Sequence, residues 1–402
     1  MSELIIKKDS TLADFEEYLG ITDLKDRTLI VPNNIKEGGS MGHSLQYCQF
    51  LLTWARAKEN PVAYSFLIGD DTDKIESFAK KPHGLAAAYF SNKIISDRGK
   101  GEDIKHQILS AAAPRIKAMH NGNIDEIRYG PRLDFVFIEG AEHQFHGALY
   151  SRVPNAYELE DGETHKDCVR KTKECNDSLF NWLTKLGVAK DIQGKLLKQK
   201  DLSNENNQED GTLGRVLCEA FENTCQHAFR HPDGAHLKKN MRCVSIVKNT
   251  TIGRDRIAKI DVSSQKARKP AKDYFEHLAS KFTTNERKTI EMLEFSIFDS
   301  GSGFASSAKL KDNTSDDLKL VMQCFDRDIS SKPHESAGKG LYRILSAVHH
   351  LGGFLRLRTS SAEAFFASTA EFDPSMEPEK FVHGGLSHIE GTLITIGIPL
   401  KF

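Results

Sequence analysis

Short apolar runs alternate with segments of helical periodicity over residues 28–138, and this alternation constrains the fold more than any other feature of the sequence. An apolar run at 28–31 ends at Pro32, and apolar residues then recur at helical spacing over 45–55. Strands that alternate with helices in this way predict an α/β layer structure. The other elements expected here are a strand at 63–68, a helix at 103–118 and a strand at 133–138.

A polar stretch at 203–211 interrupts this pattern. It is short of apolar residues and closes with Gly211, which suits an exposed connection between two folded units. We therefore expect an N-terminal α/β domain at 1–160, a connecting helix and linker at 161–204, and a second domain at 205–402. The length of 402 residues agrees, because about 150 residues per domain gives two or three domains.

The second part of the chain has a different order of elements. A segment of helical periodicity precedes several strand-like segments, and this order predicts a two-layer α/β sandwich on an antiparallel-type sheet. The expected helices are at 213–229, 273–283 and 341–350, and the expected strands are at 242–247, 293–298, 354–358 and 392–398. Residues 250–272 are basic and predicted to be irregular.

Charge and composition exclude several classes of protein. A formal net charge of -1 excludes a chain that binds polyanions over its whole surface, and no apolar stretch reaches the roughly 18 residues of a membrane-spanning helix. The seven cysteines are scattered and form no C-x-x-C pair, so neither a zinc site nor a disulfide framework is indicated. The first residues lack the apolar core of a signal peptide, and we expect a cytoplasmic protein.

The expected helix at 213–229 has a polar stripe beside its apolar face. Glu219, Asn223 and His227 occupy positions i, i+4 and i+8 of this stripe. A carboxylate can take a proton from water, and an amide oxygen is a hard ligand that suits Mg²⁺. The alternative is the solvated polar face of an ordinary amphipathic helix.

Two further motifs can contact a flat ring. Asp299 ends a strand, and Gly301 and Gly303 follow it, so a fixed acceptor lies beside backbone that a ring can approach closely. Thr392 opens the last strand after Gly391, and its hydroxyl can reach a ligand amine or a water. The alternative for the first motif is a turn between two elements, since Asp-x-Gly is common in turns.

A fourth motif can contact phosphate. Gly338, Lys339, Gly340 and Leu341 open a helix, whose bare N–H groups and positive end attract anions. Lys339 can add a positive charge to this cradle. The alternative is a glycine-rich hinge before a helix.

The order and spacing of these four motifs resemble the GHKL ATPase superfamily. That superfamily includes gyrase-type topoisomerases, MutL proteins, heat-shock chaperones, MORC proteins, sensor histidine kinases and anti-sigma-factor serine kinases. The resemblance covers about residues 205–402 and implies a Bergerat-type ATP-binding fold. Two departures are Tyr342, where many kinases have another glycine, and a long insertion at about 249–292.

The resemblance implies a role for each matched residue. Asn223 would hold Mg²⁺, Glu219 would orient or deprotonate the attacking nucleophile, and His227 falls where kinases often carry histidine. Asp299 would accept from the adenine amino group, with Thr392 in support through water. The adenine pocket would be lined by Gly301 and Gly303, and the phosphates would be held at Gly338, Lys339, Gly340 and Leu341 beneath a lid at about 304–337.

Three functions fit this resemblance. The first is hydrolysis of Mg-ATP, with lid closure controlling a protein partner or a dimer contact. The second is a protein kinase of the anti-sigma or histidine type. The third is a nucleotide-sensing interaction module without turnover, in a regulatory or defence system.

Three segments offer weaker signals. The basic insertion at 249–272 can contact nucleic acid, although a solvated surface loop is the favoured interpretation. The glycine run at 38–42 lacks the lysine of a P-loop and is interpreted as a tight turn in which Ser40 caps a helix. A cluster of Glu139, Glu142, His143 and His146 is interpreted as surface rather than as a metal site.

Overall fold

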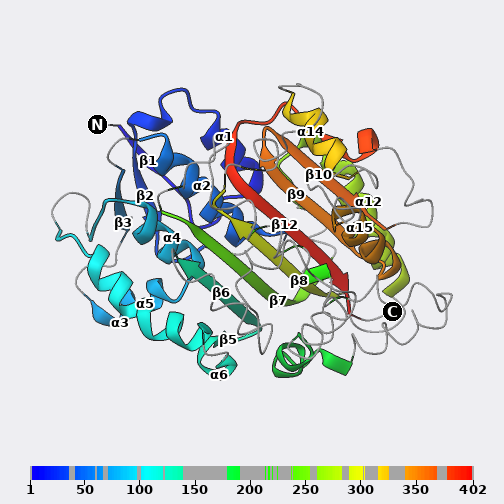
Figure 1. The fold of residues 1–402 in the computed structure, drawn as a ribbon, viewed down its shortest axis with the longest axis horizontal. Coiled ribbons are helices and arrows are strands. Elements are labelled where there is room, and N and C mark those ends of the chain that lie inside the picture. Colours follow the sequence, from blue (N-terminus) through cyan, green and yellow to red (C-terminus); the bar gives the residue numbers. More distant parts are fainter. Residues whose placement is uncertain are drawn as a thin grey trace, which may run out of the picture.

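Two sheets and the helices packed on them make up the described part of the protein (Figure 1). The computed structural model describes residues 2–35, 41–58, 61–66, 71–96, 101–120, 123–138, 179–190, 239–253, 260–282, 289–301, 316–325, 340–368 and 378–400, with 213, 216, 217, 220, 224, 237 and 303. Within these residues no helix has the length and apolar character needed to cross a membrane.

The first sheet is parallel and has the order β1-β2-β3-β4. Helices connect its strands, so the α/β structure predicted for the first part of the chain is confirmed. The strands are β1 (Glu3–Ile5), β2 (Thr28–Pro32), β3 (Val62–Phe66) and β4 (Lys93–Ile95). The helices between them are α1 (Leu12–Leu19), a 3-10 turn (Leu24–Asp26), α2 (His43–Arg56), α3 (Thr72–Ala79) and α4 (Pro82–Phe90).

The second sheet has eight strands in the order β11-β10-β9-β12-β8-β7-β6-β5, and its neighbouring strands are antiparallel. An antiparallel sheet was expected from the second part of the chain. Its strands are β5 (Arg128–Tyr129), β6 (Arg132–Ile138), β7 (Met241–Gly253), β8 (Thr289–Asp299), β9 (Phe354–Ser360), β10 (Ala362–Ala367), β11 (Val382–His383) and β12 (Ile389–Pro399). Helices α5 (Lys105–His120) and α6 (Ile124–Ile127) precede it.

This sheet crosses the domain division expected at 161–204. Strand β6 comes from the first part of the chain and pairs with β7 from Arg132 opposite Val247 to Ile138 opposite Met241. The two parts of the chain therefore share one sheet. Sequence periodicity predicted the strands at 133–138 and 242–247 but carries no information on which strands pair.

Helix α2 joins the two sheets. It follows β2 of the parallel sheet and packs against β12 and β8 of the antiparallel sheet. All of its residues are buried except Thr53 and Arg56, so it is an internal helix rather than a surface one. Its four buried polar side chains, which include Gln46 and Gln49, need partners in the sheet.

Helices cover both faces of the antiparallel sheet at its centre. Every residue of β9 is buried, and all but Glu390 are buried in β12. Figure 1 shows α15 (Gly340–His350) in front of the sheet and α2 and α12 (Gln265–Phe282) behind it. The predicted two-layer sandwich accounts for helices on one face of the sheet only. Helices from the first part of the chain and from the insertion add a third layer on the other face.

The insertion between β7 and β8 is more regular than the sequence suggested. Strand β7 continues to Gly253, and α12 begins at Gln265 rather than near 273. The helix includes Pro270, although proline removes a helical hydrogen bond. Burial of Ala267 and Ala271 stabilises this first part of the helix despite the proline.

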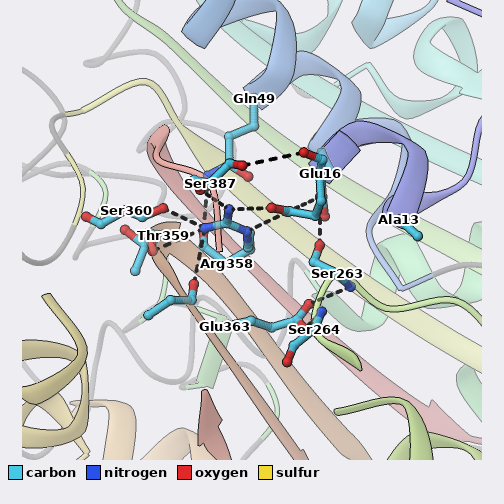
Figure 2. A network of polar contacts seen from close by, with 12 residues as sticks. Ala13, Glu16, Gln49, Ser263, Ser264, Arg358, Thr359, Ser360, Glu363 and Ser387 are labelled. Carbon is cyan, nitrogen blue, oxygen red and sulfur yellow. Dashed lines mark hydrogen bonds and ion pairs between the residues drawn. The ribbon is translucent and has the colours of Figure 1, made fainter. Parts of the chain in front are cut away.

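Buried polar contacts connect the helices of the first part to the antiparallel sheet. Figure 2 shows Glu16 of α1 and Arg358 of β9 pointing toward one another, and their Oε1 and Nε atoms are 2.9 Å apart. Arg356 of β9 forms a fully buried ion pair of 2.7 Å with Glu363 of the neighbouring β10, and it also donates to Gln46 of α2. The Glu16–Arg358 pair fixes α1 on the sheet because separating it leaves a buried charge, and the hydrogen bond to Gln46 ties α2 to β9.

Candidate functional site

The candidate site lies at the end of β8, where the strand finishes at Asp299 as the sequence predicted. Asp299 is the direct partner of Thr392 in β12 and of Arg242 in β7. All three residues are buried, and Asp299 and Thr392 are each 5% exposed. The structure thus brings together an acid and a hydroxyl that stand in separate motifs of the sequence.

The turn after β8 is held by hydrogen bonds to its own residues and to β7. The Gly301 N–H donates to Oδ1 of Asp299 at 2.9 Å. The Ser300 hydroxyl accepts from the Met241 N–H at 2.8 Å and donates to Oδ1 of Asn240 at 2.9 Å. These contacts fix one carboxylate oxygen of Asp299 against the turn.

Two glycines of the site have backbone conformations that other residues rarely adopt. Gly303 has φ +85°, and a Cβ there would lie 2.9 Å from the Thr359 hydroxyl oxygen. Gly391 has φ +76°, and a Cβ there would collide with the carbonyl oxygen of Asp299. The close approach of β12 to Asp299 therefore depends on glycine at 391, and the approach of the loop after β8 to Thr359 depends on glycine at 303.

Burial raises the pKa of Asp299 to about 7. The Gly301 N–H, the positive charges of Arg242 and Arg56, and the Thr392 hydroxyl all act in the opposite direction, but burial dominates. A carboxyl group with such a pKa changes charge near neutrality. Acids with strongly shifted pKa values are common at binding and catalytic sites. A buried acid of this kind lowers the stability of the fold, so its presence points to a function.

Helix α2 contacts this site at its C-terminal end. Arg56 donates to the Ser300 and Gly301 carbonyl oxygens and forms an ion pair of 2.7 Å with Glu390 at the start of β12. The Gln49 side chain donates to the Gly391 carbonyl oxygen at 3.2 Å. Sequence reasoning missed Arg56 and Gln49, since no motif marks a residue whose partners lie far along the chain.

The predicted phosphate-binding motif is partly described. Helix α15 begins at Gly340, and Leu341 is buried in its first turn. This helix packs against β9, β10 and β12, the last of which carries Thr392. Gly338 and Lys339 lie outside the described residues, as does most of the expected lid, of which α14 (Asp317–Cys324) is described.

The expected helix at 213–229 is also partly described. Its described residues are helical and buried, namely Leu213, Val216, Leu217, Ala220 and Thr224, which agrees with the expected apolar face. Glu219, Asn223 and His227 lie outside the described residues. The residues that are described contain no group of three or more His, Cys, Asp or Glu able to hold a metal ion.

The beginning of α2 is occupied by a side chain of the protein itself. The Met41 and Gly42 N–H groups donate to the Glu294 carboxylate of β8 at 2.7 and 3.0 Å. Gly42 is the N-cap residue, so the predicted cap at Ser40 is wrong, and Ser40 itself lies outside the described residues. These two N–H groups of the helix end therefore already have an acceptor within the protein. The cluster at 139–146 is outside the described residues.

Of the motif residues that the structure describes, Asp299 ends β8, Gly340 begins α15 and Thr392 is the fourth residue of β12. No family model, no curated protein and no solved structure matches the chain. The inference of a function therefore depends on the residues around Asp299.

Proposed function

We propose that the chain binds an adenine nucleotide, with the 6-amino group of the base donating to the Asp299 carboxylate. The observation that carries this proposal is the buried Asp299, which is 5% exposed and has a pKa near 7. A buried carboxylate is costly unless several donors satisfy it. Gly301 supplies one donor to Oδ1, and an exocyclic amine would supply another.

The choice of adenine over guanine follows from the resemblance of the four motifs to the GHKL superfamily. Adenine would donate to Asp299 through its amine at C6, whereas guanine would have to turn its N1–H and 2-amino donors toward the acid. Gly303 and Gly391 have positive φ, which allows the backbone on either side of the site to turn tightly. The Thr392 hydroxyl, across from Asp299 in the sheet, can hold a water against the base.

We further propose that the bound nucleotide is Mg-ATP and that the chain hydrolyses it. Gly338, Lys339, Gly340 and Leu341 at the start of α15 would receive the phosphates, because a helix N-terminus attracts anions. Asn223 would hold Mg²⁺, which neutralises phosphate charge when bound. Glu219 would take a proton from the attacking water, which gives ADP and inorganic phosphate.

Equilibrium binding of ATP and GTP in the presence of Mg²⁺ tests the base assignment. We expect ATP to bind at least about 10-fold more tightly, since a hydrogen bond to a charged group contributes about 1.5–3 kcal/mol. Equal binding of the two nucleotides, or binding of neither, would contradict it.

ATP labelled at the γ-phosphate separates hydrolysis from the two other functions. Free labelled phosphate supports an ATPase, label on a protein side chain supports a kinase, and binding without either supports a nucleotide sensor. Asn223→Ala should abolish binding of Mg-ATP. Glu219→Ala should retain binding and stop turnover, and full turnover by this variant would remove Glu219 from the mechanism.

A further inference from the structure

Arg56 connects the first part of the chain to both sides of the candidate adenine site. Its Nη1 atom lies 3.2 Å from the Gly301 carbonyl oxygen and 2.7 Å from Oε2 of Glu390, and its Nη2 atom donates to the Ser300 carbonyl oxygen. The Arg56 side chain is 21% exposed and that of Glu390 is 27% exposed. The planar guanidinium can hold these partners at once because its donors have a fixed fork geometry.

The contact with Ser300 acts directly on Asp299. The Ser300 carbonyl and the Gly301 N–H belong to the same planar peptide unit, and they point in opposite directions. Arg56 donates to the Ser300 carbonyl oxygen of this peptide unit, and the Gly301 N–H of the same unit donates to Oδ1 of Asp299 at 2.9 Å. Arg56 therefore orients the peptide that holds the carboxylate, and hydrogen bonds in such a chain strengthen one another.

The other side of the site is tied to the same helix. Glu390, the ion-pair partner of Arg56, immediately precedes Gly391 and Thr392. Gln49 donates to the Gly391 carbonyl oxygen at 3.2 Å and to the Arg358 carbonyl oxygen at 3.1 Å. Gln49 and Arg56 are seven residues apart, so they lie on one face of α2, two helical turns from each other.

We propose that Arg56, supported by Gln49, is a positioning residue of the adenine site, so that helix α2 of the first part of the chain sets its affinity for the nucleotide. This inference rests on the proposed binding of an adenine nucleotide at Asp299. It makes the first part of the chain a component of the nucleotide site instead of a separate recognition domain.

The positive charge of Arg56 allows a pH-dependent measurement to distinguish a positioning role from a purely structural one. The charged groups that act on Asp299 are Arg242 of β7 and Arg56 of α2, and both lower its pKa against the effect of burial. Glu390 pairs with Arg56, and Nε2 of His388 lies 3.5 Å from Oε1 of Glu390. A hydrogen bond to the Glu390 carboxylate raises the pKa of His388. Loss of the Arg56 charge should raise the pKa of Asp299, so that a higher pH is needed to ionise the acceptor.

The test is the Kd of the full chain for Mg-ATP between pH 5.5 and 9, with the wild type, Arg56→Met and Arg56→Lys. We expect Arg56→Met to bind about 10-fold more weakly at pH 7, as loss of a charged hydrogen bond implies, and to have its pH midpoint moved upward. Arg56→Lys should keep the wild-type midpoint because it keeps the charge, while binding more weakly. Arg27→Met is the matched control, since the main chain of Arg27 also contacts the end of α2 but its side chain pairs with Asp23 at 3.0 Å and not with the turn after β8.

The pH dependence of the Kd in these variants decides the inference. The expected shift of the midpoint in Arg56→Met, with none in Arg27→Met, supports it. An unchanged Kd in Arg56→Met overturns it, and so does a loss of affinity that is equal at every pH, because that loss would reflect folding alone. If the wild type binds ATP and Asp299→Asn weakens this binding while Arg56→Met does not, only this inference fails; if the wild type binds no adenine nucleotide, the proposed function fails with it.

Discussion

Asp299 of β8 and Thr392 of β12 are direct partners in the antiparallel sheet, and both are 5% exposed. Their pairing places an acid and a hydroxyl side by side at a strand end. The acid is held by the Gly301 N–H, and the turn around it is held by Arg56 of a helix from the other part of the chain. A costly buried carboxylate in such a rigid setting is the feature from which the proposed function follows.

Asp299→Asn should stabilise the protein at high pH and not at low pH. The folded pKa of about 7 lies above the unfolded value of about 3.9, so below about pH 4 the acid is protonated in both states. Between about pH 4 and 7 the carboxyl ionises in the unfolded state and stays protonated in the folded state, so a rise in pH stabilises the unfolded chain and lowers the free energy of unfolding. We expect the variant to gain about 2–4 kcal/mol at pH 8 and much less at pH 5, measured by urea unfolding without nucleotide. The same gain at both pH values, or a loss at pH 8, would contradict the raised pKa.

Gly391→Ala should impair the site more than the same change at Gly385. Both glycines have positive φ, +76° and +80°, so alanine costs about 1–2 kcal/mol of backbone strain at each. Only at Gly391 does the new Cβ also collide with the Asp299 carbonyl oxygen, since nothing lies within 4 Å at Gly385. Thermal unfolding and ATP binding of the two variants measure the difference, and equal effects would show that the approach of Gly391 to Asp299 has no importance.

Glu363→Ala should destabilise the fold strongly. The Glu363 carboxylate is fully buried and accepts from Arg356 at 2.7 Å and from the Ser264 N–H at 2.6 Å. Removal of one partner of a buried pair leaves the other charge uncompensated and costs about 3–5 kcal/mol. Glu76→Ala is the control, because the Glu76–Lys80 pair is about half exposed and contributes at most about 0.5 kcal/mol. Urea unfolding of both variants should separate them, and a Glu363→Ala effect as small as that of Glu76→Ala would refute the buried pair.

A fragment of residues 205–402 should not fold by itself. It lacks β6, which pairs with β7, and α2, which packs on β12 and β8. In the fragment Glu294 would lose the Met41 and Gly42 N–H donors, and Arg358 would lose Glu16. Circular dichroism and size-exclusion chromatography should show an unfolded or aggregated fragment. A monomeric fragment that unfolds cooperatively and binds ATP as the full chain does would contradict the shared sheet.

Local elements were predictable from the sequence because local patterns determine them. Strand β2, helix α2 and strand β8 have the apolar spacing that their burial requires, and the acid at the end of β8 follows from its position in the strand. The short strands β10 and β11 were missed. Strand β11 has only two residues and β10 has six, and their pairing with neighbouring strands defines them.

Long-range relationships were not predictable in the same way. The pairing of β6 with β7 depends on which strands meet after the chain has travelled through about 100 residues, and periodicity does not encode this. Arg56 and Gln49 have the same limitation, because their partners are carbonyl oxygens of the main chain at 300, 301 and 391. Main-chain acceptors occur at every residue, so no side-chain motif indicates them.

Calorimetric titration with ATP and with purine riboside triphosphate, which lacks the 6-amino group, tests directly whether Asp299 recognises the adenine amine. The wild type and Asp299→Ala are compared at pH 8, where the Asp299 carboxyl is mainly ionised. We predict that the wild type binds ATP about 10- to 150-fold more tightly than the analogue, and that Asp299→Ala binds the two with similar affinity. A wild type that does not distinguish the two ligands, or an Asp299→Ala variant that still prefers ATP to the same degree, would show that Asp299 does not recognise the adenine amine.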